Sequence, residues 1–432
     1  MNFRRLIYLG AVFALALVAA SCGDTFRPIV IPLNPNPPSG KLQHFMVFTS
    51  NNGLAASGDA SRIDVSGDTN VGSLQVGLGP VHGAILPNDS EIYIANSGDD
   101  SVTAFTSTGT STFISLPAGA VPIFLGTTEI SNIYAADSGN GTVAAINTAT
   151  NVATIIPLAV NSASFRPVAL AETPAGDKVY VANQGNNSVS VITTSDRLAH
   201  TPIPVGMSPV WVSMRSDGRR AYVLSSGSST ISTLDTTTDT VTNTVPVSSG
   251  SNFMSYDPVF NRLYVTSNSA TTVNVFDVSG DQPSALASID LAAATNSLCT
   301  AGCVPTSIGV RADGSRAYVS FYMISGGTLN AGIAVINTGT TAITKFVSLP
   351  SATIDTSNAT GCSTARFRLF VAAAADNSRV YVSECDSGNV GILDTTDDSF
   401  LLNLPSPLSA FPASTPGAAP PLQNPMFVFT GL

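Results

Sequence analysis

The stretch KVYVANQGNNSVSVI, from Lys178 to Ile192, recurs in related forms along the chain. Each copy consists of a short apolar run that contains a tyrosine, a turn of small polar residues and a second apolar run. Seven tyrosines mark the copies: Tyr93, Tyr134, Tyr180, Tyr222, Tyr264, Tyr318 and Tyr381. Neighbouring tyrosines of this series lie 41 to 63 residues apart, and most intervals fall between 41 and 46 residues. The chain is therefore a repeat array, and its apolar runs have the length of β-strands.

A period in the forties that is filled with strands predicts an all-β fold, a single β-propeller of four-stranded antiparallel blades. The copy quoted above divides into strands at Phe165–Glu172, Lys178–Asn183, Ser188–Thr193 and His200–Val205. The second of these strands is apolar on both faces, as expected of a sheet packed between two neighbours. The residue two positions after the tyrosine is usually small, as at Ala182, which would let adjacent blades approach.

The two ends of the repeat region are incomplete in complementary ways. His44–Ser50, Ser61–Val65 and Ser73–Val76 look like second, third and fourth strands without a first strand. Pro425–Thr430 looks like a first strand with nothing after it. Joined, these segments complete one composite blade and leave no sheet edge open at the ends of the ring. The count is then eight blades, with seven as the alternative.

The N-terminus reads as an export signal, with basic Arg4 and Arg5 before an apolar run that ends at Ala20. Such a run is short for a membrane span. Cys22, directly after small residues, resembles the lipobox cysteine of bacterial lipoproteins, which implies acylation at Cys22. An ordinary secretory signal is the alternative. Gly23 follows the cysteine where Asp would favour retention in the inner membrane, so the resemblance favours the outer membrane.

These features divide the chain into a signal peptide at 1–21, a lipidated cysteine with a proline-rich tether at 22–41, and a propeller at 42–432. Within the tether, PIVIPLNPNPPSG at Pro28–Gly40 predicts an extended, semi-rigid spacer. We therefore expect a protein of the cell envelope that a lipid holds at the membrane, facing the periplasm or the cell surface.

The composition excludes one large class of partner. The formal net charge is −10, and the lysines are Lys41, Lys178 and Lys345 alone. Binding to nucleic acid requires clustered cations against the phosphates, so nucleic acid is not an expected partner. With 44% hydrophobic and 11% charged residues, the body of the chain is expected to fold rather than to be disordered.

The runs VYVANQGNNSVSVI, IYIANSGDD and LYVTSNS resemble the YVTN-type β-propeller repeat of bacterial and archaeal surface and periplasmic proteins. The resemblance covers roughly Phe45 to Leu432 and implies a fold more than an activity. Some relatives resemble lactonases or the non-catalytic subunits of quinoprotein dehydrogenases. The single tryptophan, Trp211, has no Asp after it, so the repeat does not resemble the WD type.

The sequence predicts no catalytic residue, metal or cofactor. His44, His82 and His200 lie in different repeats without ligand spacing, and we find no nucleophile elbow, zinc-protease motif or phosphate loop. Turns that carry Asp99, Asp100, Asp137 and Asp386 could supply oxygen ligands to Ca²⁺, but Asp is also a favoured turn residue. His82 is the histidine expected near the central channel. Candidate channel-lining arginines are Arg215, Arg311, Arg366 and Arg368, with a position on the rim as the alternative.

Besides Cys22 the chain has four cysteines, and an even number in an exported protein suggests disulfides. The expected pairs are Cys299 with Cys303 and Cys362 with Cys385, because each pair would meet on one rim. Four cysteines allow three connectivities, and a zinc site is the rival interpretation. A zinc site is disfavoured because no histidine is placed to complete its ligands and because an oxidising compartment favours disulfides.

Wide repeat spacings mark insertions at Ala292–Val304, Met323–Gly332 and Ser351–Thr364, all expected on the rim of the second-to-third turns. Because loops on a rigid scaffold often carry recognition residues, we expect a binding or scaffolding module whose partner is a protein or another cell-envelope ligand. The alternative is a lactonase-like or oxidoreductase-type enzyme with its site at the channel mouth. At least three ionisable side chains converging on that mouth would favour the enzyme.

Overall fold

The computed structural model describes residues 45–51, 57–65, 67–106, 109–292, 297–299, 302–354, 361–363, 365–406 and 424–431. The chain divides into two compact units, Met1–Ser39 and Gly40–Leu432, and the first lies outside the described residues. The predictions for the signal peptide, Cys22, the tether and His44 therefore concern residues that the structure does not describe.

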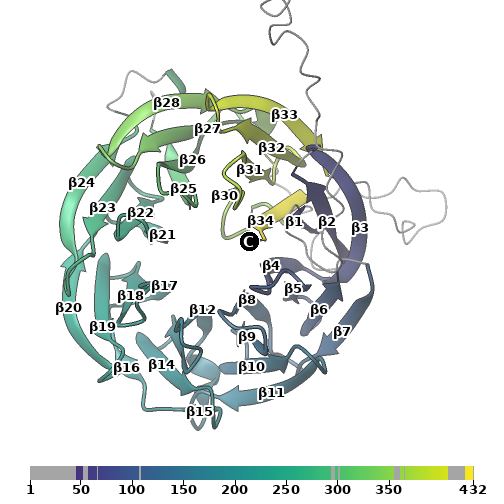
Figure 1. Cartoon of the computed structure of the whole chain (residues 1–432), viewed down its shortest axis with the longest axis vertical. Coiled ribbons are helices and arrows are strands. Elements are labelled where there is room, and N and C mark those ends of the chain that lie inside the picture. The colour runs from purple at the N-terminus through teal and green to yellow at the C-terminus, as the bar shows by residue number, and fades with distance from the viewer. Residues whose placement is uncertain are drawn as a thin grey trace, which may run out of the picture. The chain divides into compact units, whose positions relative to one another are not determined.

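Apart from two 3₁₀ turns, Ser162–Ser164 and Ser297–Cys299, the elements among the described residues are β-strands. They form eight antiparallel sheets, which we number 1 to 8 in chain order. Figure 1 shows the sheets arranged radially around one axis. The predicted all-β fold of four-stranded antiparallel blades is confirmed.

The strands of each sheet follow one another outward from the axis. Sheet 1 contains β34 (Asn424–Thr430), β1 (Phe45–Asn51), β2 (Ser57–Asp64) and β3 (Thr69–Leu78). Sheet 2 contains β4 (Pro80–Ile85), β5 (Glu91–Asn96), β6 (Ser101–Thr106) and β7 (Ser111–Ser115). Sheet 3 contains β8 (Pro122–Gly126), β9 (Asn132–Asp137), β10 (Thr142–Asn147) and β11 (Val152–Pro157). Sheet 4 contains β12 (Pro167–Glu172), β13 (Lys178–Asn183), β14 (Ser188–Thr193), β15 (Leu198–Ala199) and β16 (Ile203–Pro204).

The second half of the ring repeats this order. Sheet 5 contains β17 (Pro209–Met214), β18 (Arg220–Ser225), β19 (Thr230–Asp235) and β20 (Thr240–Pro246). Sheet 6 contains β21 (Ser251–Asp257), β22 (Arg262–Ser267), β23 (Thr272–Asp277) and β24 (Ser284–Asp290). Sheet 7 contains β25 (Val304–Val310), β26 (Arg316–Ser325), β27 (Thr328–Asn337), β28 (Ala342–Ser348) and β29 (Ala352–Thr353). Sheet 8 contains β30 (Leu369–Ala373), β31 (Arg379–Glu384), β32 (Asn389–Asp394) and β33 (Ser399–Pro405).

Several boundaries differ from the prediction: β12 begins at Pro167 rather than Phe165, β2 spans Ser57–Asp64 and β3 spans Thr69–Leu78. Two further differences are larger. The expected strand His200–Val205 is instead the pair β15 and β16, which contact opposite ends of β14. Pro202 and Pro204 lack the backbone N–H that a continuous ladder needs. The expected insertion at Met323–Gly332 is a long hairpin, because β26 and β27 each have ten residues and stay paired to Ser325 and Thr328.

The ring closes through sheet 1. The C-terminal strand β34 pairs antiparallel with β1, with Met46 opposite Thr430 and Phe48 opposite Val428. Residues more than 370 positions apart thus share one ladder. The closure predicted from the two incomplete ends is therefore present. In this sheet β1 pairs with β2 on one side and with β34 on the other, so β1 has no open edge.

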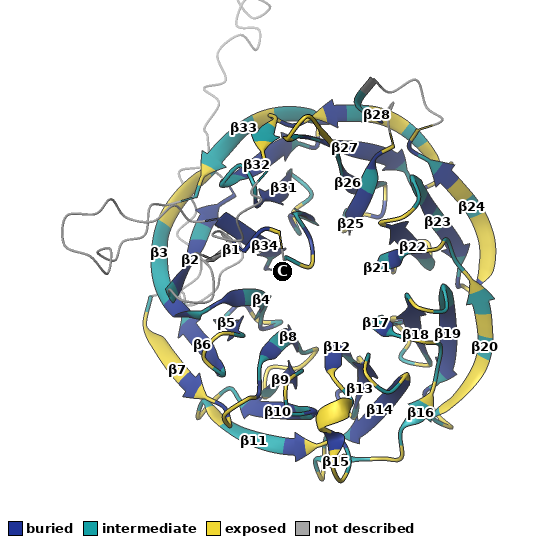
Figure 2. Cartoon of the chain, turned by 180° about the vertical axis from the view of Figure 1, so that it is seen from behind, coloured by how far each residue is buried: buried dark blue, intermediate teal, exposed yellow. Residues whose placement is uncertain are grey.

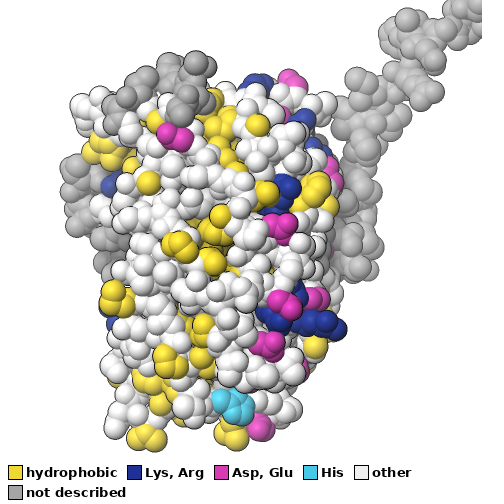
Figure 3. Space-filling model, turned by 90° about the vertical axis from the view of Figure 1, so that its left-hand side faces the viewer, with side chains coloured by type: hydrophobic (Ala, Val, Ile, Leu, Met, Phe, Trp, Pro, Cys, Tyr) yellow, Lys and Arg dark blue, Asp and Glu magenta, His cyan; other side chains and the backbone are white. Residues whose placement is uncertain are grey.

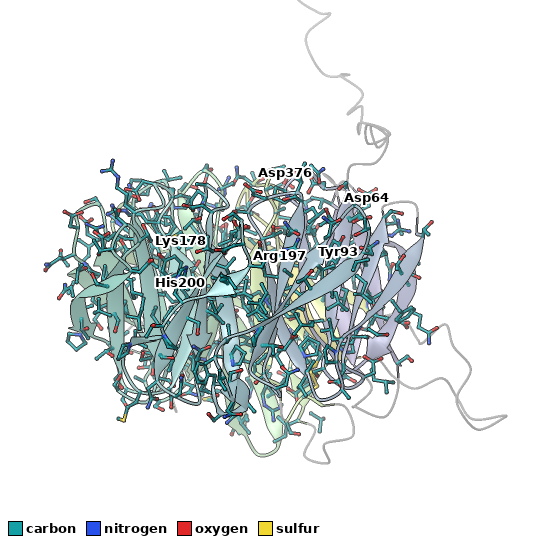
Figure 4. The ribbon with its side chains drawn as sticks, turned by 90° about the horizontal axis from the view of Figure 1, so that it is seen from below. Asp64, Tyr93, Lys178, Arg197, His200 and Asp376 are labelled. Carbon is teal, nitrogen blue, oxygen red and sulfur yellow. A yellow bond between two sulfur atoms is a disulfide. The ribbon has the colours of Figure 1, made fainter. Side chains whose placement is uncertain are left out.

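The sheets have two rims. Rim A carries the turns between second and third strands, such as residues 184–187, and the connections between sheets. Rim B carries the turns between first and second strands and between third and fourth strands, such as residues 374–378. Figure 4 labels Asp64 and Asp376, which both lie on rim B. First strands run from rim A to rim B, so the chain enters β1 and leaves β34 on rim B.

The core lies between neighbouring sheets. Second strands are buried on both faces, as in β13, while fourth strands such as β20 are largely exposed. Figure 2 shows this gradient from buried inner strands to a partly exposed outer wall. The seven repeat tyrosines, Tyr93, Tyr134, Tyr180, Tyr222, Tyr264, Tyr318 and Tyr381, are among the largest fully buried side chains.

Several of the buried tyrosines also tie their own sheet to the next one. The hydroxyl of Tyr318 donates to Asp398 at 2.7 Å, and Arg316 contacts the same carboxylate at 2.6 Å. Asp398 lies in the third-to-fourth turn of the following sheet, in the left-handed conformation with φ of 56°. The same arrangement joins Tyr180 and Lys178 to Asp239, and Tyr381 and Arg379 to Asp68. A tyrosine is therefore useful here beyond its apolar ring, because its hydroxyl crosses the boundary between two sheets.

Candidate functional site

A layer of aromatic side chains fills the axis of the ring. His82, Phe124, Trp211, Phe253, Phe370 and Phe427 come from the first strands β4, β8, β17, β21, β30 and β34. They form a closed circuit in which neighbouring ring centroids are 4.0 to 5.6 Å apart. The space between the ribbons at the centre of Figure 1 is thus occupied by side chains. The layer forms a floor, so a ligand would approach from one mouth rather than pass through.

The register of each sheet positions this layer. Within the repeats, the aromatic residue lies 10 or 11 positions before the repeat tyrosine, as Trp211 does before Tyr222. It pairs with the residue two positions after the tyrosine, as Phe124 does with Ala136. Sequence reasoning missed this layer, although its spacing was readable. In β12 the equivalent residue is Ala169, opposite Ala182, so that strand contributes no aromatic ring.

His82 belongs to this layer. Its imidazole stacks on Phe124 with centroids 4.1 Å apart and contacts Phe427 at 4.4 Å. Its Nδ1 accepts a hydrogen bond from the backbone N–H of Leu125 at 3.2 Å. Burial, with a contribution from the positive charge of Arg366, lowers the pKa of His82 to about 3. The imidazole is therefore neutral at physiological pH and poorly matched to general acid–base work.

Arg366 lies on the rim A side of the aromatic floor. Its guanidinium is 5.0 Å from the ring centroid of Trp211 and 5.4 Å from that of Phe367. It also donates to the carbonyl of Val168 at 3.2 Å and to the carbonyl of Val210. The side chain comes from the connection before β30 and reaches β12 and β17 in sheets 4 and 5. Burial within the ring lowers the pKa of Arg366 to about 10, although its side chain stays open to solvent at the mouth, so the group is charged at neutral pH.

Above Arg366 lies a pocket of about 720 Å³ on rim A. Its described lining includes Arg166, Gln184, Asn252, Asn268, Arg366 and Phe367, together with serine and glycine residues of the neighbouring turns. Among the described residues that line it there is no Asp or Glu. The pocket is therefore positively charged, and the rest of its lining mixes neutral polar groups with the apolar side chains of Ile123, Val168 and Val210.

A repeated backbone feature positions Arg166 at this mouth. The residue before several first strands adopts positive φ: Gly79, Val121, Arg166, Ser208 and Gly250. Its carbonyl accepts a hydrogen bond from the residue that follows the second strand, as the carbonyl of Arg166 does from Gln184 at 3.0 Å. This bond holds the start of each first strand against the second-to-third turn, and in sheet 4 it places an arginine there.

The other candidate arginines lie elsewhere. Arg215 follows β17 directly, on rim B, and pairs with Asp217 at 2.8 Å. Arg311 follows β25 on the same rim and pairs with Asp313 at 3.0 Å. Both arginines therefore lie on the rim, which was the alternative to a position in the channel. Arg368 lies on rim A, where its partner is Asp386 at 2.6 Å.

Both expected disulfides are present. Cys299 pairs with Cys303 in the connection between β24 and β25. Cys362 pairs with Cys385, which joins the connection before β30 to the turn after β31. Both bridges lie on rim A, at the two inserted connections. The rest of these insertions, 293–296, 300–301, 355–360 and 364, lies outside the described residues.

The aspartates of the second-to-third turns bind backbone and side-chain donors. Asp99 accepts from the N–H of Leu78 at 2.8 Å, and Asp100 accepts from the N–H groups of Gly119 and Val121. Searching the described part of the chain finds no group of three or more His, Cys, Asp or Glu that could hold a metal. Within the same part, no helix has the length and apolarity to span a bilayer.

No protein-family model and no curated protein matches the chain in sequence. Solved structures share its architecture. Dihydro-heme d1 dehydrogenase NirN in complex with DHE has a TM-score of 0.64 at 13% identity, covering 90% of this chain and 75% of that one. Kuenenia stuttgartiensis hydrazine synthase has a TM-score of 0.54 at 16% identity, and the match covers 74% of this chain and 96% of that one. The fold is a β-propeller. At these identities the likeness concerns the fold alone.

One buried carboxyl of the propeller lies directly beneath the pocket wall. Asp137 ends β9, next to the lining residue Ser138, and is fully buried. One of its oxygens accepts from Thr142 at 3.0 Å, and the other has no partner among the described residues. Burial raises the pKa of Asp137 to about 8. Two other repeats have an asparagine at the equivalent position, three residues after the repeat tyrosine: Asn96 and Asn183.

We expect Asp137→Asn to stabilise the propeller at alkaline pH. Between about pH 4 and pH 8 the folded state keeps a proton on Asp137 that the unfolded state has released, so this group makes stability fall as pH rises. The amide cannot ionise, and it can donate to Thr142 as Asn96 does to Ser101 and Thr103. The gain at pH 8.5 should be on the order of 1–3 kcal/mol. Urea denaturation at pH 5 and pH 8.5 measures it.

Some pH dependence should remain in the Asp137→Asn variant. Burial also raises the pKa of Glu384 to about 7, and its contribution has the same sign. A variant whose stability falls between pH 5 and pH 8.5 as steeply as that of the parent protein would show that Asp137 is not the buried acid described here.

Proposed function

We propose that this protein is a lipid-anchored, extracytoplasmic propeller of the YVTN-repeat type that binds a cell-envelope partner through rim A. The observation that carries the proposal is the concentration of features on that rim. The pocket, both disulfides and the long hairpin of β26 and β27 all belong to it. Rim B carries short turns that repeat from sheet to sheet.

The construction of rim A suits recognition. The second and third strands of each sheet are paired on both sides and are largely buried, so they form a rigid support beneath the rim. The Cys362–Cys385 bridge ties one inserted connection to the turn after β31, and the Cys299–Cys303 bridge closes a loop within the other, next to the start of β25. Loops held in this way lose less conformational freedom when a partner binds, which favours affinity.

The enzyme alternative is less well supported. It calls for at least three ionisable side chains at the channel mouth, and the described pocket lining contains two, both arginines. Neither is a general acid or base at neutral pH, since an arginine remains protonated. His82 lies in the aromatic floor with its pKa lowered to about 3. A pocket of this kind is better suited to holding an anion than to transferring a proton.

The anchor is testable through Cys22. Cys22→Ser should move the protein from the membrane fraction to the soluble fraction after cell lysis. If membrane partition is unchanged, the protein is not held there by a lipid on this cysteine.

The binding role is testable by loop replacement. Exchanging residues 292–304 and 351–364 for short Gly-Ser turns, together with Cys385→Ser, removes both insertions and leaves no unpaired thiol. The variant should still fold, since surface-loop length has a small entropic effect, although loss of the disulfides should lower its stability by about 2–5 kcal/mol. It should lose the envelope partner that the parent protein retains in a pull-down. Retention of that partner, or turnover of a lactone that disappears in His82→Ala, would overturn the proposed function.

A further inference from the structure

The pocket on rim A is a positive site in a negative protein. The chain has a formal net charge of −10, yet the described lining contains two arginines and no carboxylate. Figure 3 shows a side wall on which charged groups are few and opposite charges lie close together. In contrast, Arg166 and Arg366 have no carboxylate partner among the described residues. Two unpaired cations that face one pocket favour an anionic ligand.

Arg366 is held in place for such a contact. Two of its N–H groups donate to the carbonyls of Val168 and Val210, and its plane is packed near Trp211 and Phe367. A guanidinium has five N–H donors, so donors remain for a ligand. Arg166 also lines this pocket, and it is two residues before Val168, whose carbonyl accepts a hydrogen bond from Arg366. Guanidinium groups form strong, charge-assisted hydrogen bonds with oxyanions.

The amides of the opposite wall also offer donors. The side-chain oxygen of Asn252 accepts from Thr266 at 3.0 Å, and that of Asn268 accepts from Ser269 at 3.0 Å. Each amide therefore has an NH₂ group that no described residue binds. With Gln184 and the lining serines, these groups offer hydrogen-bond partners to hydroxyl groups, while Ile123, Val168 and Val210 supply apolar contact beside them. The volume of about 720 Å³ is enough for a small organic molecule.

We propose that the rim A pocket binds a small polyhydroxylated molecule that carries an oxyanion, that is, an acidic sugar or a sugar phosphate. The oxyanion contacts Arg366 and Arg166, and the hydroxyl groups contact the amide wall. This inference rests on the proposed binding function and names the ligand class for that rim. The aromatic floor limits the depth of entry, so the ligand lies at the mouth.

Isothermal titration calorimetry with four probes tests the ligand class. D-glucuronate and D-glucose 6-phosphate carry both the oxyanion and the hydroxyl groups. D-glucose lacks the oxyanion, and hexanoate lacks the hydroxyl groups. At least one of the first two should bind, with D-glucose and hexanoate binding about tenfold or more weakly. The stronger of the first two probes shows whether a carboxylate or a phosphate is preferred.

Three variants test the residues. Arg366→Gln and Arg166→Gln should each weaken binding of the preferred probe about tenfold or more. Arg219→Gln, an exposed arginine of rim B, removes the same charge and should leave the affinity unchanged. Unchanged melting temperatures show that each variant is folded. A variant that does melt earlier is replaced by Arg→Lys at the same position, which keeps the charge and should bind with intermediate affinity.

The proposal is overturned if neither anionic probe binds at millimolar concentration. It is also overturned if D-glucose or hexanoate binds as tightly as the preferred anionic probe, or if both pocket variants bind that probe with the affinity of the parent protein. These outcomes concern the ligand class only. The proposed function fails separately, when the loop-replaced protein still captures its envelope partner.

Discussion

Truncation after Met426 should leave a chain that no longer closes its ring. The deleted segment contains most of β34, whose Phe427, Val428 and Phe429 are each less than a tenth exposed. Burying such a side chain contributes about 1.5–3 kcal/mol, so three of them contribute roughly 5–9 kcal/mol before any relaxation. That loss is comparable with the whole stability of a typical domain. The truncation also removes the ladder with β1 and one ring of the aromatic floor.

The measurement is chemical denaturation, with binding of a hydrophobic dye and size-exclusion chromatography as further readouts. A control that lacks only residues 431 and 432 keeps β34 and should unfold like the full chain. We expect the longer truncation to bind dye and to associate, because β1 then has an open edge. If it unfolds at the same denaturant concentration as the control, the ring is closed by contacts other than those of β34.

Phe253→Ala should destabilise the propeller by about 3–5 kcal/mol. Phe253 is one member of the aromatic floor, where its ring centroid lies 4.5 Å from that of Trp211, 5.5 Å from that of Phe367 and 5.6 Å from that of Phe370. Its removal leaves a cavity that sheets fixed by their neighbours cannot easily fill. Phe113 supplies the matched control, since it lies on the outer strand β7 and is 52% exposed.

Urea denaturation of the two variants makes the comparison. Phe113→Ala should change the free energy of unfolding by less than about 0.5 kcal/mol. Similar losses in both variants would mean that the aromatic circuit is not a packed layer. A large loss for Phe253→Ala together with weaker binding of the pocket probes would also show that the floor supports Arg366.

Sequence periodicity predicted the strands because burial in this fold repeats. Val179, Tyr180 and Val181 are buried from both sides, and their apolar character is therefore visible without coordinates. The role of the tyrosine hydroxyl was not predictable in the same way. Tyr180 contacts Asp239, which is 59 residues away in the next sheet, and no local pattern links the two. The disulfides were predictable because Cys299 and Cys303 lie in one insertion, and because Cys362 precedes the first strand and Cys385 follows the second strand of one repeat.

The candidate site was less accessible to sequence reasoning. Arg366 contacts Val168 and Val210, 198 and 156 residues away, and it comes from an inserted connection that aligns with no repeat. Arg215 and Arg311 looked equivalent to it because they too lie near first strands. Each follows the end of its strand by one residue, and that single step places the side chain on rim B beside a turn aspartate. Proximity to a first strand does not tell which mouth a side chain faces.

The central claim is that rim A is the binding face. Site-specific photo-cross-linking in cells tests it with a matched pair of exposed apolar positions, Met207 on rim A and Val259 on rim B, which are 57% and 48% exposed. A photoreactive amino acid at position 207 should form a discrete adduct with an envelope component, and the adduct should disappear in the loop-replaced protein. The same amino acid at position 259 should form none. Adducts of equal yield from both positions, or from position 259 alone, would contradict the account.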